Sequence, residues 1–229
     1  MVTIRERIEA IREKIAESAS RTGHNTFGIK LLAVTKTRAV NEMLEAAPLV
    51  DGFGENRVQE AASKKQAWPT SIELNWRLIG RLQSNKVRKA VTLFDSLDSI
   101  DSIDIACLTE RIAAEENKTI PILLEVNTSG EASKAGVTPD DFPELLDRVL
   151  ECRHLKLEGL MTMGPMTADD TPIRRAFAML RGVAENARIR SGLPLPVLSM
   201  GMSDDFELAI EEGSTMVRIG TSLFGPRSC

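Results

Sequence analysis

The sequence predicts an α/β fold: a single TIM-type (β/α)8 barrel with an extra N-terminal helix. Short apolar runs rich in β-branched residues alternate with longer segments of helical spacing along the whole chain. The apolar runs number eight, which is the strand count of such a barrel. The 229 residues suffice for one large core, so we expect one domain over residues 1–229.

The expected strands are short, largely apolar segments. They cover Ile29–Thr35, Val50–Gly54, Trp76–Gly80, Leu93–Ser96, Pro121–Val126, Leu157–Met161, Pro196–Ser199 and Met216–Ile219. Continuous apolar runs are typical of strands covered on both faces, and strand–helix alternation is typical of a parallel sheet. An open, doubly wound sheet fits the same alternation, but the number of strands favours closure into a barrel.

The expected helices show apolar residues at helical spacing. One of them, about Ile4–Ser18, precedes the first strand and is the extra helix. The others separate successive strands and cover Val40–Ala47, Asn56–Ala67, Asn85–Val91, Ser102–Asn117, Pro139–Glu151, Pro172–Arg190 and Asp204–Glu212. No linker or low-complexity stretch divides the chain.

Charge and hydropathy exclude two classes of partner. The 29 Lys and Arg residues and the 33 Asp and Glu residues are spread along the chain, with a net charge of -4, so neither nucleic acid nor an acidic membrane is expected. No segment approaches the roughly 20 apolar residues that span a bilayer. Met1 leads into a charged helical pattern rather than an apolar signal core, so we expect a cytoplasmic protein.

The cysteines and histidines are poorly suited to metal binding or hydrolysis. Cys107, Cys152 and Cys229 lie far apart and form no Cys-x-x-Cys pair, so we expect reduced thiols and no metal site. The two histidines, His24 and His154, stand in no motif with a serine or cysteine nucleophile. A small-molecule function without a hydrolytic triad fits this composition best.

Three strand ends carry residues suited to binding a phosphorylated aldehyde. Lys36 ends the first strand, where the neutral amine of a lysine can form an imine with a carbonyl group. Glycine-containing turns, Ser199–Ser203 and Arg218–Thr221, end the last two strands, where barrels often bind phosphate. Glycine lets backbone approach an anion, Ser203 is placed to open a helix, and Thr221 adds a hydroxyl donor. A solvated surface lysine is the alternative interpretation of Lys36.

Several blocks of sequence resemble one protein family in the same order. The blocks are Ala33-Val-Thr-Lys36-Thr, Phe53-Gly-Glu-Asn56-Arg-Val-Gln-Glu, Trp76-Arg-Leu-Ile-Gly80-Arg-Leu-Gln-Ser-Asn-Lys86, Leu160-Met-Thr-Met163, Leu198-Ser-Met-Gly-Met-Ser-Asp-Asp205 and Val217-Arg-Ile-Gly-Thr221. Together they resemble the pyridoxal phosphate homeostasis proteins. The resemblance implies a barrel like the N-terminal domain of alanine racemase, with pyridoxal 5'-phosphate (PLP) as the cofactor.

The resemblance also implies a role for each residue of the site. Lys36 would carry PLP as an aldimine, and Asn56 would line the cofactor. The phosphate would be held by Ser203, Gly220 and Thr221, with help from Ser199 and Gly201. Arg218 would face the pyridine nitrogen, where a second positive charge disfavours protonation and makes the ring a weaker electron sink.

Two further residues bear on the resemblance. Lys134 stands where the family often has a second lysine near the barrel mouth; a solvated loop lysine is the alternative interpretation. Arg77 departs from the family, which usually has histidine there, so no role of that histidine is carried over.

The leading functional hypothesis is a cofactor protein without substantial catalysis. It would hold PLP, maintain intracellular vitamin B6 levels and contact PLP-dependent apo-enzymes transiently, as a monomer. An amino-acid racemase is the main alternative, but racemisation needs two placed bases and the sequence contains no tyrosine to partner the lysine. A Schiff-base aldolase, which needs no cofactor, is the third candidate. No catalytic residue is therefore assigned.

Overall fold

A closed barrel forms the centre of the molecule. The structure is a computed structural model that describes residues 2–22 and 28–226. Its parallel strands pair in chain order and close between the last and the first. They are β1 Lys30–Val34, β2 Gly52–Glu55, β3 Trp76–Leu78, β4 Ser96–Ile100, β5 Ile120–Glu125, β6 Leu155–Met161, β7 Val197–Ser199 and β8 Met216–Ile219. The predicted fold class is confirmed, and the open sheet is excluded.

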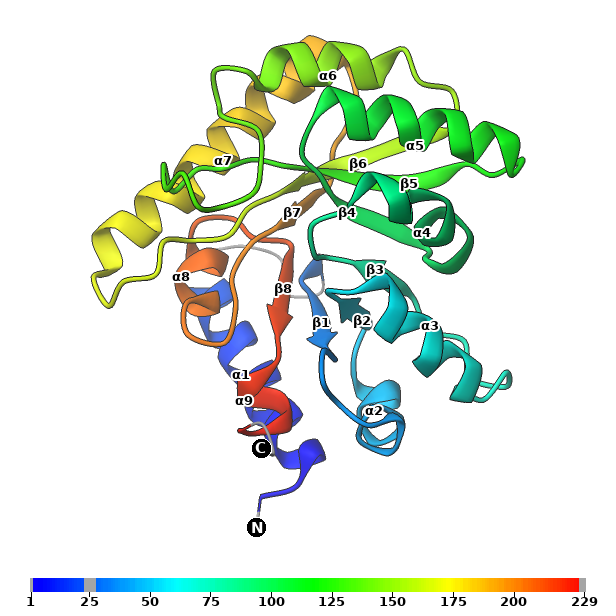
Figure 1. Cartoon of the computed structure of the whole chain (residues 1–229). Helices are drawn as coiled ribbons and strands as arrows, with labels where there is room; N and C mark the ends of the chain where they lie inside the picture. The colour runs from blue at the N-terminus through cyan, green and yellow to red at the C-terminus, as the bar shows by residue number, and fades with distance from the viewer. Residues whose placement is uncertain (1, 23–27, 227–229) are drawn as a thin grey trace.

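Helices surround the barrel (Figure 1). They are α1 Ile4–Thr22, α2 Val40–Ala46, α3 Val58–Ala67, α4 Val87–Leu93, α5 Ile103–Glu115, α6 Phe142–Leu150, α7 Asp170–Ser191, α8 Phe206–Glu211 and α9 Thr221–Phe224, with 3-10 turns η2 Ala47–Leu49 and η3 Ser84–Lys86. The extra helix α1 packs against α8 and α9, beside the last strands. Among the described residues, no helix is both long and apolar enough to cross a membrane.

The predicted fourth strand, Leu93–Ser96, is wrong in position. Leu93 is the last residue of α4, and β4 begins at Ser96. The strand was missed because Ser96 and Asp98 interrupt its apolar pattern. Both are buried polar residues on the inner face of the barrel, where the Ser96 hydroxyl donates to Asp98 Oδ1 at 2.7 Å.

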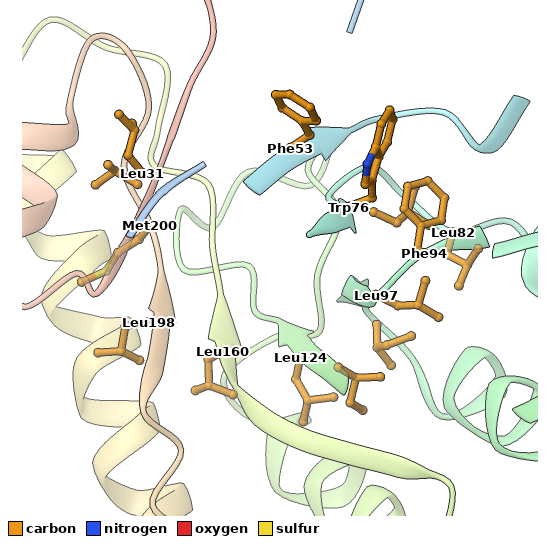
Figure 2. Packing of buried hydrophobic residues seen from close by; sticks show 14 of the residues in the cluster. Leu31, Phe53, Trp76, Leu82, Phe94, Leu97, Leu124, Leu160, Leu198 and Met200 are labelled. Carbon is orange, nitrogen blue, oxygen red and sulfur yellow. The ribbon is translucent and has the colours of Figure 1, made fainter. Parts of the chain in front are cut away.

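The main hydrophobic core lies between the barrel and its helices. Successive strands contribute outward side chains to one continuous layer, and Figure 2 shows among them Leu97, Leu124 and Leu160. Each of these three is fully buried. Burying such a side chain stabilises the fold by about 1.5–3 kcal/mol, so the layer fixes the direction in which every strand faces.

The inner face of the barrel is divided into an apolar and a polar part. A small cluster of Leu32, Leu123, Met161, Val197 and Met216 forms the apolar part. Strand residues alternate between the two faces, so side chains two positions further along a strand also point inward. On β5 and β8 these are Glu125 and Arg218, both almost fully buried. Charged groups therefore lie inside the barrel toward the carboxyl ends of its strands.

Three of the predicted structural residues can be placed. His154 Nδ1 lies 2.9 Å from Glu110 Oε1, and Cys107 and Cys152 are free thiols. His24 and Cys229 lie outside the described residues.

Candidate cofactor site

The predicted site residues come from four adjacent strands. Lys36 follows β1, Asn56 follows β2, Ser199 ends β7 and Arg218 lies on β8. The barrel pairs β7 with β8, β8 with β1 and β1 with β2. Because all strands are parallel, their carboxyl ends open at one mouth, and the sequence-predicted residues line a continuous part of it.

Lys36 is held by the chain on both sides. The Thr35 amide donates to Gly54 O at 3.0 Å, which ties the residue before the lysine to β2. Thr37 has a φ of 64°, a left-handed conformation that is rare for a β-branched residue. Its amide donates to Glu60 Oε1 and its hydroxyl to Lys36 O at 2.6 Å. Such a strained residue persists only where its neighbours fix it, so the backbone at Lys36 is well defined.

The turn after β7 is tightly packed around Gly201. This residue has a φ of 95°, and a Cβ there would lie 2.6 Å from the Ala209 Cβ. The Gly201 carbonyl accepts from the Arg218 amide at 3.0 Å, which joins the turn to β8. Asp205 closes the turn by accepting the Met202 amide at 2.6 Å. Only glycine fits at position 201 without displacing α8.

The two predicted phosphate turns contact each other. The Ser222 amide, one residue after Thr221, donates to the Ser203 hydroxyl oxygen at 3.3 Å. Gly220 brings the second turn close to β1, since a Cβ there would lie 3.4 Å from the Val34 Cβ. The turns after β7 and β8 therefore meet beside the end of β1, two residues from Lys36.

A hollow of about 350 Å³ opens beside these turns. Its lining includes Ser203 and Ser222 from the turns and the cationic residues Arg7 and Lys14 from α1. Hydroxyls, backbone amides and nearby cations are the groups that bind phosphate in proteins. The lining also carries three carboxylates, and Lys14 pairs with one of them at 2.9 Å. Ser203, Ser222 and Arg7 therefore remain as the groups suited to a phosphate ester.

Arg218 is a buried cation with neutral hydrogen-bond partners. Its guanidinium donates to Ser199 Oγ at 2.7 Å and to Thr162 O at 2.8 Å. Burial lowers the pKa of Arg218, while the charges of Glu125, Asp98 and Asp205 raise it. A guanidinium nevertheless stays protonated in proteins, so the inner face carries a fixed positive charge.

Asn56 stands where β2 and β3 end. A Cβ on Gly80 would lie only 2.3 Å from Asn56 O, so the glycine lets the chain after β3 reach the Asn56 backbone. The two family-like blocks around these residues therefore meet in space.

Besides Arg218, the inside of the barrel holds charged residues to which the sequence analysis gives no role. Arg77 is 5% exposed and forms two hydrogen bonds to Asp98, at 2.7 and 2.9 Å. Such a bidentate pair is a strong interaction, and it gives the arginine at this departure from the family a structural role. The partners are 21 positions apart, so no local pattern connects them. Glu125 was detectable, because it is the only charged residue in the run Ile120–Glu125.

Glu125 is a buried carboxyl without a complete set of partners. It is 2% exposed, and its Oε2 has no hydrogen-bond partner among the described residues. Burial raises the pKa of Glu125 to about 7, against the opposing charge of Arg218. Asp101 raises this pKa further and Arg81 lowers it.

Lys134 is a partly buried lysine of the loop after β5 rather than a solvated one. Its Nζ donates to Gly164 O at 2.5 Å and pairs with Glu131 at 2.8 Å, and its side chain is 13% exposed. These contacts latch the loop after β5 to the segment after β6.

Known proteins share this fold and chain length. The family model described as alanine racemase, N-terminal domain, matches residues 7–228. A pyridoxal phosphate homeostasis protein of Pseudomonas aeruginosa is 42% identical, over 99% of this chain and 97% of that protein. The structure of PipY from Synechococcus elongatus with PLP bound aligns with a TM-score of 0.80 at 36% identity, covering 92% of this chain and 100% of PipY.

An alanine racemase of Clostridium difficile shares the fold alone. It is 14% identical, with a TM-score of 0.72, and the match covers 95% of this chain but 56% of the racemase. Barrel and family model together define the class of this protein, the alanine racemase N-terminal domain type. Within that class, the chain belongs to the pyridoxal phosphate homeostasis protein family, which confirms the resemblance seen in the sequence.

Proposed function

We propose that this chain binds PLP covalently through Lys36 and maintains PLP homeostasis. The observation that carries the proposal is the meeting of the turns after β7 and β8 beside the end of β1. That arrangement supports a phosphate-binding region close to Lys36. Family membership supports the same cofactor, because relatives are named for PLP homeostasis and PipY was solved with PLP.

In this proposal, each site residue has a physical task. Bound PLP supplies a reactive aldehyde and a pyridine ring. The Lys36 amine anchors the aldehyde carbon, and Asn56 lines the ring. Arg218 faces the ring nitrogen and disfavours its protonation, because two positive charges would then be neighbours.

The phosphate is held at the other end of the mouth. Ser203 and Thr221 offer hydroxyls, while Gly201 and Gly220 let backbone amides approach the oxygens. Ser199 contributes indirectly, because its hydroxyl oxygen accepts a hydrogen bond from Arg218. The glycine cradle and this donor set fit a phosphate monoester.

We further propose that the chain stores and delivers the cofactor rather than turning over amino acids. Arg218 makes the ring a weak electron sink, and the sequence has no tyrosine to serve as the second base of a racemase. The proposal has the chain act as a cytoplasmic monomer that meets PLP-dependent apo-enzymes transiently. No side chain is assigned a catalytic task.

Loading experiments test the anchor. The purified chain is incubated with PLP and desalted, and its absorbance is compared with that of the Lys36→Ala and Lys134→Ala variants. Wild type and K134A retain a visible absorbance band after desalting, whereas K36A loses it. Retention of the band by K36A contradicts the proposal.

Turnover and transfer experiments test the proposed role. The loaded chain is incubated with L-alanine, and the D-enantiomer is measured by chiral chromatography. We expect no turnover above the level of K36A. In the transfer experiment, we expect the same loaded chain to restore activity to a PLP-dependent apo-enzyme within a short incubation. Efficient racemisation of alanine by the loaded chain supports the racemase instead.

A further inference from the structure

Glu125 lies on the inner face of the barrel, at the end of β5. Its neighbour Leu124 points outward into the main core, and Leu123 points inward. Alternation along the strand therefore directs Glu125 inward, toward the same interior as Arg218 on β8. The register agrees, because Glu125 pairs with Met161 and Arg218 pairs with Leu32, both inward residues.

This carboxyl group has no role in the fold that its contacts explain. It is 98% buried, since its exposed fraction is 2%, and Oε2 lacks a hydrogen-bond partner among residues 2–22 and 28–226. An unpartnered buried polar group costs about 1–3 kcal/mol. An apolar residue would avoid that cost, so the carboxyl at this position points to a role other than stabilising the fold.

The charges around Glu125 come from three neighbouring elements. Arg218 on β8 and Arg81 after β3 favour the ionised carboxyl, while Asp101 after β4 favours the protonated one. Asp98 on β4 accepts two hydrogen bonds from Arg77, so its charge is already balanced by that guanidinium. Arg218 therefore remains as the buried cation whose charge Glu125 offsets.

We propose that Glu125 is a positioning residue of the cofactor site: it is the counter-charge of Arg218, and it takes up a proton when a ligand engages that guanidinium. The inference rests on the proposed function, which places the cofactor ring at Arg218. A ligand that contacts the Arg218 guanidinium and carries anionic oxygens competes with the ionised carboxylate for the positive charge. Glu125 then takes up a proton and becomes neutral.

Proton uptake by Glu125 makes ligand affinity depend on pH. Without ligand, burial raises the pKa of Glu125 to about 7. Ligand binding raises it further, so binding is accompanied by proton uptake above pH 7 and affinity falls as pH rises there. Below that range Glu125 is protonated in both states, and its contribution is constant.

The test measures the dissociation constant of PLP for wild type and Glu125→Gln across pH. Both chains share the ionisations of the phosphate and of Lys36, so these cancel in the ratio of the two constants. We expect the wild-type dissociation constant divided by that of E125Q to be near one at about pH 6 and to rise by about tenfold by pH 9. A rise of about one unit in the pKa of Glu125 on binding requires that change. Calorimetry in two buffers measures the same proton uptake directly.

Two further variants separate this role from a structural one. Glu125→Asp keeps a carboxyl and retains the pH dependence, whereas Glu125→Leu abolishes it as the glutamine variant does. Glu151→Gln, at a side chain that is 66% exposed beside α6, is the control and behaves as wild type. Thermal melting verifies that each variant is folded.

The outcomes are distinguishable. Tight PLP binding with a ratio that does not change with pH overturns this inference and leaves the proposed function standing. Failure of wild type to load PLP overturns both. The inference is supported when the ratio of wild type to E125Q rises with pH and the ratio of E125D to E125Q rises in the same way.

Discussion

Two buried glutamates end strands of the same barrel and are held in opposite ways. Glu55 ends β2 and faces outward, where Lys64 from α3 lies 2.7 Å from its Oε1 and the Thr35 hydroxyl donates to the same oxygen. Glu125 ends β5 and faces inward. The Oε2 of each glutamate lacks a hydrogen-bond partner among the described residues, but within that part of the chain only Glu55 has an ion pair through its Oε1. Burial raises the pKa of both, but only that of Glu55 is lowered in turn by hydrogen bonds.

The difference separates a structural charge from one available to the site. Lys64 also donates to Thr35 O and pairs with Glu60, so the outer network ties α3 to the backbone just before Lys36. Breaking such a network costs stability, because the remaining charge stays buried. Within residues 2–22 and 28–226 the inner carboxyl has no such network, so its removal is expected to alter electrostatics more than fold.

Lys64→Met has the largest expected effect. It leaves Glu55 buried without its cation and lowers the free energy of unfolding by about 3–5 kcal/mol. Urea denaturation followed by circular dichroism measures the change. Lys156→Met, at a pair whose lysine side chain is 66% exposed, is the control and costs less than about 1 kcal/mol. Equal losses in the two variants contradict the structural role of the buried Lys64–Glu55 pair.

Glu125→Gln has the next largest effect, and it depends on pH. The pKa of Glu125 rises from 4.5 to about 7 on folding, so between these values the folded chain binds more protons than the unfolded one. Stability contributed by the protonated carboxyl is complete below 4.5 and falls as pH rises toward 7. E125Q lacks this loss, so above pH 7 it is more stable than wild type by up to about 3 kcal/mol.

Denaturation at several pH values checks this prediction. Wild type and E125Q have similar stabilities near about pH 4 and diverge as the pH rises, because Gln resembles the neutral acid. A stability difference between wild type and E125Q that is independent of pH shows that Glu125 does not titrate in this range. The contrast between Glu125 and Glu55 would then be wrong.

Gly201→Ala has a smaller effect and sharpens the comparison, because the turn it disturbs is held by packing rather than by charge. The new Cβ would lie 2.6 Å from Ala209 Cβ and would require a φ of 95°. We expect a loss of about 1–3 kcal/mol and weaker PLP loading. Gly182→Ala is the control, since nothing lies within 4 Å of that Cβ and alanine favours the helix α7. Unchanged loading by G201A argues against the phosphate turn.

The sequence predicted most of the fold, because burial on both faces of a parallel strand leaves a visible apolar run. It placed Lys36, Asn56 and the two turns at strand ends, and the structure has them there. It misplaced β4, whose inward polar residues break such a run. The Arg77–Asp98 pair could not be foreseen, because a buried charge depends on which strands become neighbours.

Lys36 is the proposed covalent anchor of the cofactor. The PLP-loaded chain is treated with borohydride, digested and mapped by mass spectrometry, with K36A processed in parallel. We expect a single modified lysine, Lys36, and no modification in K36A. Modification at Lys134 or another lysine, with Lys36 unmodified, contradicts the account.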